Sequence, residues 1–306
     1  MKETYDVIIL GAGPTGLAAG IHSAQFGLRT LVLETDEKAG GIAVRARSVT
    51  NYPGFVRISG LRLMERMTRQ AKRAGVEVHT SEEVVGLSLE KERVVETRRD
   101  TYSYKALILA TGNGMKGLDL KGETWIGSGV AYCAECNMPF FKGNDIIVAG
   151  SVTEAIGEAL YLTKIAKRVR LVNHKNMISI EEQTRKLLEK EGVQLIEDFV
   201  GEKIHGRPPN KRLLLRHVNG SKAKQLKTNI VFVVGGVKPF VSVLQKAGIN
   251  THRLGCTIVD EFGRTNIEGV FAAGGCASTV RDIIPPCIGD GAYVATCVRL
   301  YLKYAS

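Results

Sequence analysis

The chain has little that would place it in a membrane or outside a cell. No stretch of about 18 residues is both apolar and uncharged, which argues against a transmembrane helix. The N-terminal segment lacks the order of parts of a signal peptide, so we expect a cytoplasmic protein. Six cysteines in 306 residues are too few for a secreted disulfide framework. No low-complexity segment is present, and an apolar share of 44% excludes a disordered or fibrous chain.

Aromatic residues are also scarce, at 6%. Because few of them interleave with the scattered basic residues, we do not expect nucleic-acid binding. The net charge of +11 is uneven, since residues 114–238 hold 20 basic and 13 acidic residues, a local excess of +7. This excess serves either solubility or the docking of an acidic protein partner, whose encounter it would steer.

Two of the cysteines form a C-x-x-C pair, Cys133 and Cys136, with Glu135 between them. A structural zinc site needs four ligands, and no second C-x-x-C and no later H-x-x-x-H is present to supply them. No metal is therefore expected, and a redox-active dithiol in a reducing compartment is the better interpretation. The other four cysteines are isolated and are expected to be core thiols: Cys256, Cys276, Cys287 and Cys297.

Glycine is abundant, at 34 of 306 residues, and its placement is informative. Gly11, Gly13 and Gly16 match G-x-G-x-x-G between a predicted strand at 5–10 and a predicted helix at 14–26. In this fingerprint the first glycine allows a tight turn, the second lets a pyrophosphate approach, and the third lets the helix pack closely. Glu34 ends the next predicted strand, where an acid binds ribose hydroxyls. The segment therefore predicts a dinucleotide site.

A second β-α-β unit repeats this pattern. It has a predicted strand at 145–149, a loop at 150–155, a helix to about residue 167 and a strand at 169–172. Together the two units predict an α/β fold with two doubly wound, Rossmann-like nucleotide-binding domains, the second inserted into the first. Further predicted elements complete both domains, namely strands at 105–110, 212–218, 229–234 and 270–272 and helices at 59–75 and 289–303. In the helix at 59–75, Leu61, Met64 and Met67 give the apolar spacing.

The motifs together resemble the thioredoxin reductase family, the small flavoproteins with FAD and a C-x-x-C dithiol. The resemblance spans nearly the whole chain. It rests on Gly11–Gly16, Glu34, Gly40–Gly41, Asn51–Gly54, Ala110–Gly112, Gly129–Cys136, Ala272–Gly274 and Gly289–Gly291.

The family's fold implies three-layer (ββα) domains. It would make residues 1–113 and 239–306 the FAD domain. Residues 114–238 would form the inserted NAD(P)H-like domain that carries the dithiol. Members are usually homodimers.

The resemblance also implies site residues. FAD contacts would fall on Gly11, Gly13, Pro14, Thr15, Gly16, Glu34, Gly40, Gly41, Ile42, Asn51, Val84, Thr111, Gly112, Gly274, Arg281, Asp282 and Ile283. Cys136 would face the flavin and Cys133 would attack the disulfide of a thioredoxin-like protein. Thiolates are the species that exchange with disulfides, and a C-x-x-C motif can lower the pKa of one thiol, so the pair suits this chemistry.

The second nucleotide loop departs from the family. Its fingerprint positions are Gly150, Val152 and Ala155, and the β-branched Val152 should block a pyrophosphate. The stretch that holds the 2′-phosphate in relatives is here Asn173–Asn176, which contains no arginine; Lys175 offers one phosphate contact. We therefore expect a donor other than NADPH, with NADPH kept as the alternative.

Some relatives without that motif take electrons from reduced ferredoxin or a reduced deazaflavin. The reduction potentials of plant-type ferredoxins lie at about −400 mV and that of thioredoxin lies at about −270 mV, so electron transfer from ferredoxin to thioredoxin is downhill. An acidic ferredoxin would also suit the basic inserted domain.

Two smaller departures concern mechanism. In the family an acid usually follows the second cysteine. Here that position holds Asn137, which cannot titrate, so Glu135 is the candidate acid. In the family an aspartate usually bonds the ribityl chain of the flavin. Here that position holds Gly275, and Asp282 is the candidate to replace the lost carboxylate. We expect FAD to be held more weakly than usual.

Two other functions stay open on the sequence. One is a dithiol oxidase that passes electrons from a small dithiol through FAD to oxygen, and the other is a non-catalytic, redox-sensing flavoprotein. The intact C-x-x-C beside an intact first loop favours the protein disulfide reductase.

Overall fold

The chain folds into two compact α/β units, one formed by Met1–Gly114 with Lys238–Ser306 and the other by Met115–Val237. The computed structural model describes residues 4–46, 49–89, 92–112, 117–118, 120–122, 129–131, 141–150, 154–173, 180–235, 239–252, 255–277 and 283–304. Within these ranges, no helix combines the length and the apolar character that crossing a membrane requires. The first unit is built from two separate stretches of chain, and the second unit lies between them in sequence.

A seven-stranded sheet forms the centre of the first unit, in the order β3-β2-β1-β6-β5-β4, with β15 paired to β6. The strands are β1 (Thr4–Leu10), β2 (Thr30–Leu33), β3 (Glu77–His79), β4 (Val84–Ser88), β5 (Val94–Thr97), β6 (Thr101–Leu109) and β15 (Val270–Ala272). Strands β1, β2, β3, β6 and β15 are parallel. The antiparallel β5 pairs with the first half of the long β6, and β15 pairs with its last residues.

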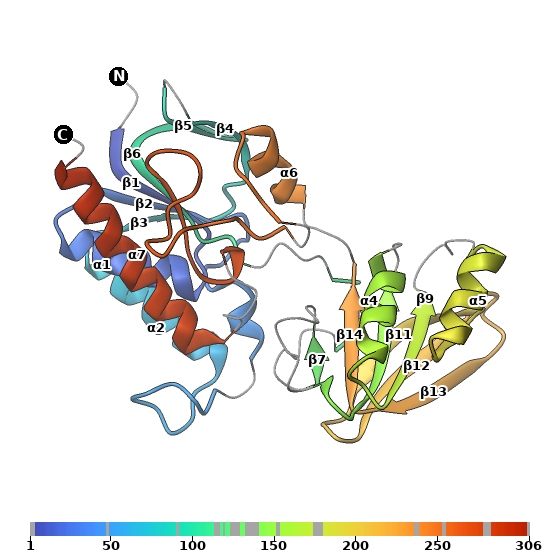
Figure 1. Cartoon of the computed structure of the whole chain (residues 1–306). Helices are drawn as coiled ribbons and strands as arrows, with labels where there is room; N and C mark the ends of the chain where they lie inside the picture. Colours follow the sequence, from blue (N-terminus) through green and yellow to red (C-terminus); the bar gives the residue numbers. More distant parts are fainter. Residues whose placement is uncertain are drawn as a thin grey trace. The chain divides into compact units, whose positions relative to one another are not determined.

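Alternation along β1 divides the core of this unit into two layers. Val7 and Ile9 face one cluster, whereas Ile8 and Leu10 face the other, as the period of two in a strand requires. Three helices gather on the first face (Figure 1): α1 (Pro14–Gln25), α2 (Gly60–Arg73) and α7 (Ile284–Tyr304). The other face is covered by side chains of β4, β5 and α6 (Pro239–Lys246). Strands buried on both faces explain the continuous apolar run of β1.

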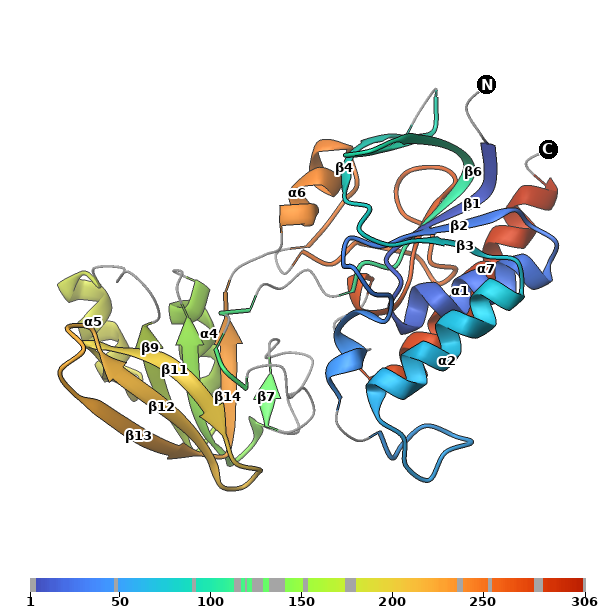
Figure 2. The ribbon, with the colours of Figure 1, turned by 180° about the vertical axis from the view of Figure 1, so that it is seen from behind.

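The second unit has a parallel sheet in the order β10-β9-β8-β14-β7 and a separate antiparallel sheet β11-β12-β13. The strands are β7 (Val130–Ala131), β8 (Asp145–Gly150), β9 (Arg168–Asn173), β10 (Val193–Ile196), β11 (Phe199–His205), β12 (Lys211–His217), β13 (Ala223–Thr228) and β14 (Ile230–Val234). Ile146 and Val148 pack under the helices α4 (Glu154–Thr163) and α5 (Glu182–Lys190). Ile147 and Ala149 pack under the antiparallel sheet, which Figure 2 shows on the opposite face.

The α/β fold predicted from the sequence is confirmed, and both β-α-β units form. The last helix begins earlier than predicted, at Ile284 rather than near residue 289. Pro285 and Pro286 lie in its first turn, where a backbone N–H has no intrahelical partner, so proline is tolerated there. The sequence did not predict strands β7, β10, β11 and β13 or helices α5 and α6.

The apolar face of α2 differs from the prediction at one residue. Ser59 caps the helix, since its Oγ accepts a hydrogen bond from the Arg62 N–H at 3.3 Å. Met64 and Met67 are buried, as the spacing indicated. Leu61, however, is 48% exposed, and Leu63 at 2% takes the place expected for it in the core. The inward-facing stripe includes Leu63, Met64, Met67 and Ala71, which follows the helical period better than a stripe through Leu61.

These two leucines provide a matched test of the packing of α2. We expect Leu63→Ala to lower the free energy of unfolding by about 2–5 kcal/mol, because it leaves a cavity in the core. Leu61→Ala should change it by no more than about 0.5 kcal/mol, since a surface truncation removes little packing. Urea denaturation followed by circular dichroism measures both. Equal destabilisation by the two substitutions would show that α2 is rotated relative to this structure.

Candidate functional site

Four segments of the first unit follow the carboxyl ends of parallel strands. They come after β1, β2, β6 and β15, at the edge where open α/β sheets bind their ligands. Their residues make direct backbone contacts with one another. The candidate site is therefore built from parts of the chain that lie up to about 260 residues apart in sequence.

The first glycine loop makes a sharp turn between β1 and α1. Gly11 has a φ of +103°, and a Cβ there would lie 2.5 Å from the Ala110 carbonyl oxygen. A Cβ at Gly16 would lie 1.8 Å from the carbonyl oxygen of Gly11. Both positions therefore require glycine, the first for its backbone conformation and the second because the helix lies directly against the turn.

Gly13, the middle glycine, differs from the other two because it faces open space. A Cβ at this position would meet nothing within 4 Å among the described residues. Gly13 is the N-cap of α1 and supplies no side-chain acceptor, and Pro14 follows it as the first helical residue. The backbone N–H groups of Thr15 and Gly16, in the first turn, precede the intrahelical ladder. The loop thus presents bare backbone and the positive end of a helix dipole, which suits a phosphate.

Glu34 lies immediately after β2 and points its carboxylate at this loop. The side chain is buried, at 8% exposure. One carboxylate oxygen accepts the Ala12 N–H at 2.8 Å, and the other accepts the Asp36 N–H at 3.0 Å. A carboxylate has about four acceptor positions, so each oxygen keeps one for a further donor. Two adjacent hydroxyls of a ribose match that remaining capacity.

The turn at Gly40 and Gly41 lies against the same loop. The Gly40 N–H donates to the Ala12 carbonyl oxygen at 2.8 Å, and Gly40 has a φ of +128°. A Cβ at Gly41 would lie 3.3 Å from the Cα of Gly13. Ile42 follows in a short 3₁₀ helix, Gly41–Arg45, and is 49% exposed. This segment forms a second wall beside the open face at Gly13.

The C-terminal segment after β15 packs on the start of α1. Gly274 has a φ of +69°, and a Cβ there would lie 2.1 Å from the Thr15 Oγ1. Its N–H donates to the Asp290 Oδ2 at 2.7 Å. Asp290 lies in α7 and was not among the predicted site residues, although the Gly289–Gly291 motif contains it. It brings a carboxylate to the segment where Gly275 lacks one.

Thr111 and Gly112 follow β6 and border the turn at Gly11. A Cβ at Gly11 would lie 3.2 Å from the Cα of Thr111. Below them, the Cys276 Sγ lies 3.0 Å from the Leu109 carbonyl oxygen, to which it donates. Burial raises the pKa of Cys276 to about 11, so this thiol stays protonated near neutral pH and serves packing.

The isolated cysteines divide into two groups. Cys256 and Cys276 are buried, as predicted, but Cys287 and Cys297 are only half-buried on α7. Cys297 still packs against the core layer under α1, α2 and α7, so the prediction of a core thiol is wrong only for Cys287. Among the residues described, no cluster of three His, Cys, Asp or Glu side chains could hold a metal ion.

The remaining predicted flavin contacts have different surroundings. Val84 is buried at the start of β4, in the core layer that contains Leu10 and Leu33. Asn51 is exposed on the loop that the bridge between Val49 and Ile58 closes. Ile283 is 53% exposed just before α7. Arg281 and Asp282 lie outside the described residues, so their assignment stays a prediction.

The dithiol of the second unit, Cys133 and Cys136, lies outside the described residues together with Glu135 and Asn137. The last described residue before it is Ala131 at the end of β7, which pairs with Phe232 of β14. Cys133 follows Ala131 by two residues in the sequence. The dithiol therefore follows the edge strand of the parallel sheet.

The second nucleotide loop is described at its two ends. A Cβ at Gly150 would lie 2.1 Å from the Cβ of Ala155, so glycine is needed there for α4 to approach β8. Val152 and the stretch 174–176 lie outside the described residues, and the departures noted for them stay predictions.

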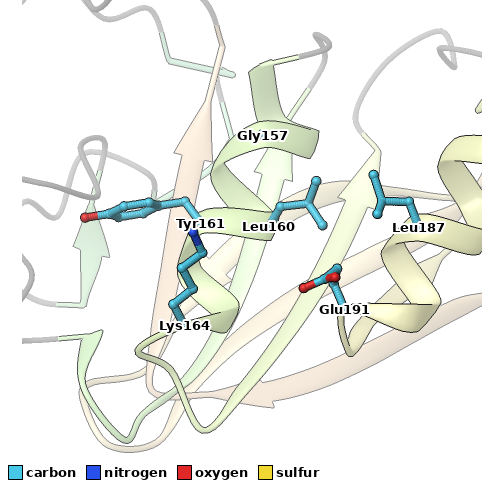
Figure 3. Close-up of a pocket in the computed structure, with 6 residues that line it drawn as sticks. All are labelled: Gly157, Leu160, Tyr161, Lys164, Leu187 and Glu191. Carbon is cyan, nitrogen blue, oxygen red and sulfur yellow. The ribbon is translucent and has the colours of Figure 1, made fainter.

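A groove with a volume of about 330 Å³ lies on the helical face of the second unit. Figure 3 shows Leu160 of α4 and Leu187 of α5 pointing toward each other across it, with Tyr161 directed away. Its other lining residues are Gly157, Lys164 and Glu191. The groove holds no thiol and no glycine loop after a parallel strand, so it is separate from the candidate site.

Comparisons with known proteins agree with this geometry. The model of the family described as pyridine nucleotide-disulphide oxidoreductase matches residues 5–291. The chain is 34% identical to a thioredoxin reductase of Peptoclostridium acidaminophilum over 99% of this chain and 98% of that protein. The structure of a thioredoxin reductase from Streptococcus pyogenes is 29% identical and covers 99% of both chains, with a TM-score of 0.67. A ferredoxin-flavin thioredoxin reductase from Clostridium acetobutylicum is 27% identical and covers 98% of both chains, with a TM-score of 0.52.

The family match spans most of the chain, and the relatives align along their whole lengths. The glycine loop, the buried acid and the C-x-x-C pair occur in one chain with this fold. The chain therefore belongs to the pyridine nucleotide-disulphide oxidoreductase family and is a flavin-dependent disulfide oxidoreductase of the thioredoxin reductase type.

Proposed function

We propose that this protein uses FAD bound to its first unit to reduce the Cys133–Cys136 disulfide, and that the dithiol then reduces a thioredoxin-like protein. The observation that carries the proposal is the loop at Gly13, an open backbone surface at a helix N-terminus beside the buried Glu34 carboxylate. A dinucleotide needs both features together, because its pyrophosphate and its ribose are recognised by different groups.

The residues present fit FAD at its two polar recognition points. The pyrophosphate would take the bare backbone of Gly13, Thr15 and Gly16, and the ribose hydroxyls would take the free acceptor positions of Glu34. Gly41 would line the side of the pyrophosphate site next to Gly13. The other proposed contacts are Gly11, Pro14, Gly40, Ile42, Asn51, Val84, Thr111, Gly112, Gly274, Arg281, Asp282 and Ile283.

Bound FAD would supply the electron pair that reduces the Cys133–Cys136 disulfide. The Cys133 thiolate then attacks one sulfur of the substrate disulfide and releases the other as a thiolate. Cys136 attacks Cys133 in the resulting mixed disulfide, which frees the second substrate sulfur and restores the Cys133–Cys136 disulfide. Two electrons thus leave the protein dithiol for each substrate disulfide. Glu135 is the proposed proton donor, because Asn137 cannot titrate.

We propose that the electron donor is not NADPH, and that it is a reduced ferredoxin or a reduced deazaflavin. Val152 and the missing arginines of Asn173–Asn176 support this, together with the similarity to the ferredoxin-flavin thioredoxin reductase of Clostridium acetobutylicum. NADPH remains the alternative donor. The family resemblance further supports a homodimer, and a dithiol that must stay reduced suits the cytoplasm.

The open position at Gly13 allows the FAD site to be tested without disturbing the fold. We expect Gly13→Ala to fold normally, because its Cβ has room, but to weaken FAD binding at least tenfold, or about 1.4 kcal/mol, by displacing the pyrophosphate. Fluorescence titration of the apoprotein with FAD measures the change. Gly157→Ala is the control, since a Cβ at Gly157 in α4 also meets nothing within 4 Å. Unchanged FAD affinity in Gly13→Ala would place the cofactor elsewhere.

The donor is tested by anaerobic mixing. The oxidised holoprotein is mixed separately with NADPH, NADH, reduced ferredoxin and reduced deazaflavin, and bleaching of the flavin absorbance is followed. We expect fast bleaching with ferredoxin or deazaflavin and slow bleaching with both nicotinamides. Fast bleaching by NADPH would overturn the proposed donor while leaving the disulfide chemistry intact.

The roles of the two cysteines are tested by trapping. Cys136→Ser should accumulate a mixed disulfide between Cys133 and a thioredoxin, because the enzyme thiol that would resolve it forward is missing and only the reverse attack by the released thioredoxin thiolate remains. Cys133→Ser should form none. Non-reducing electrophoresis and mass spectrometry detect the adduct. An adduct through Cys136, or oxygen consumption with small dithiols and no transfer to thioredoxin, would contradict the proposed function.

A further inference from the structure

The positive charge of the second unit is concentrated in its antiparallel sheet. Residues 115–237 carry a net charge of +6. The segment 199–228, which forms β11, β12 and β13, holds eight Lys or Arg residues and one acid, Glu202, for a net charge of +7. The rest of the unit is therefore close to neutral, with a net charge of −1. A solubilising excess would be spread over the surface, whereas this one occupies a single element of the fold.

The outward-facing positions of the sheet carry the exposed part of this charge. Leu213 and Leu215 of β12 are buried in the core, so Arg212 and Leu214 face outward. Arg212 lies directly opposite Lys227 on one side and His205 on the other, and Leu214 lies opposite Lys203. Like charges directly opposite each other destabilise a sheet, so the Arg212–Lys227 pairing has an energetic cost.

The neighbouring Gln225 side chain holds Arg212 in place. The Arg212 Nη1 donates to the Gln225 Oε1 at 3.1 Å, and the Gln225 Nε2 lies 2.7 Å from the His205 Nε2. Glu202 is occupied by Arg216, whose guanidinium donates to both carboxylate oxygens at 3.1 Å. This bonding, with smaller contributions from Lys121 and Lys203, lowers the pKa of Glu202. The acid is thus already paired, and within the described part of the chain Lys203, Arg212 and Lys227 form no ion pair, which leaves their charges available to a partner.

One end of the sheet lies beside the start of β7, the strand that precedes the dithiol in the sequence. A Cβ at Gly129 would lie 2.8 Å from the Pro208 Cγ and 3.1 Å from the Lys211 Cγ, so the start of β7 packs on the turn between β11 and β12. Cys133 follows Gly129 by four residues, which span at most about 14 Å. Arg207 lies in that turn and is exposed. A protein bound at this end of the sheet would therefore lie beside the start of the segment that leads to Cys133.

We propose that the outer face of β11, β12 and β13 is the surface on which an acidic, disulfide-bearing protein substrate docks. We call it the basic face and define it by Lys203, Arg207, Arg212 and Lys227, with the half-buried Leu214 at its centre. An apolar centre within a charged rim is the usual anatomy of a protein interface. Arg212 is already fixed by Gln225 and so loses less entropy on binding, which favours a specific encounter.

The chemistry of the face argues against other occupants. Phe199 is the only Phe, Tyr or Trp in the three strands, and Lys224 lies over its ring at 3.7 Å. Stacking platforms for single-stranded nucleic acid need accessible aromatic rings, so a protein fits better. Among proteins, the disulfide substrate is favoured over the electron donor, because Cys133 belongs to this unit whereas the proposed flavin contacts belong to the other unit.

The proposal rests on the proposed function and is tested on the flavin-loaded full-length protein. The test variant combines Lys203→Gln, Arg212→Gln and Lys227→Gln. We expect kcat/KM for an acidic thioredoxin to fall about tenfold at low ionic strength and to lose most of its salt dependence, because steering by charge is screened by salt. The rate with 4,4′-dithiodipyridine, a small uncharged disulfide, should not change, and neither should photoreduction of the flavin.

The control variant removes equal charge from the helical face by Lys164→Gln, Lys167→Gln and Lys190→Gln, and should keep the wild-type rates. An equal loss of kcat/KM for thioredoxin in both triple variants, or no loss in the first, would overturn the proposal that the basic face is the docking surface. It would also be overturned if the first variant lost only its reduction by ferredoxin, or if a single-stranded oligonucleotide bound the face and blocked thioredoxin. Failure of the proposed function is distinguishable, because the wild-type protein itself would then reduce dithiodipyridine but no thioredoxin.

Discussion

The candidate site depends on one close contact, between Gly16 in the first turn of α1 and the carbonyl oxygen of Gly11. A side chain at position 16 has no room, because its Cβ would lie 1.8 Å from that oxygen. The contact sets the start of α1 directly behind the turn that leaves β1. From this position, Ala12 meets Glu34 and Gly40, and Thr15 meets Gly274. The segments that follow β2 and β15 thus reach a common edge by packing on one rigid turn.

A carboxylate also reaches this edge from α7. The family's usual aspartate is replaced by Gly275, but the Asp290 carboxylate accepts the N–H of the neighbouring Gly274 at 2.7 Å. It fixes the backbone of a segment whose glycine adopts a positive φ, where other residues would be strained. Asp290 thus brings a carboxylate to this segment from helix α7. The second unit differs, because its net positive charge is concentrated in the segment 199–228 that forms the antiparallel sheet.

The β1-loop-α1-β2 unit, β8, β9, β14 and β15 were predictable from the sequence, because each has an apolar run bounded by glycine or polar residues that favour turns. The sequence did not reveal β11 or β13, whose outward positions carry lysine, a residue with low strand propensity, and whose pairing depends on contacts with β12. Leu61 was misplaced because it and Leu63 fit the local spacing almost equally, and only tertiary packing decides between them. At the site, the roles of Gly11 and Gly16 follow from local backbone geometry. The bond from Gly274 to Asp290 joins segments whose approach no local pattern specifies.

The central claim is that the open backbone at Gly13 and the carboxylate of Glu34 form the two polar ends of one dinucleotide site. A crystal structure of the protein with FAD tests it most directly. We expect the pyrophosphate to lie against Gly13 and the first turn of α1, with the adenosine ribose hydroxyls donating to Glu34 at hydrogen-bonding distance. An FAD whose ribose lies away from Glu34, or whose pyrophosphate binds outside the first glycine loop, would contradict it.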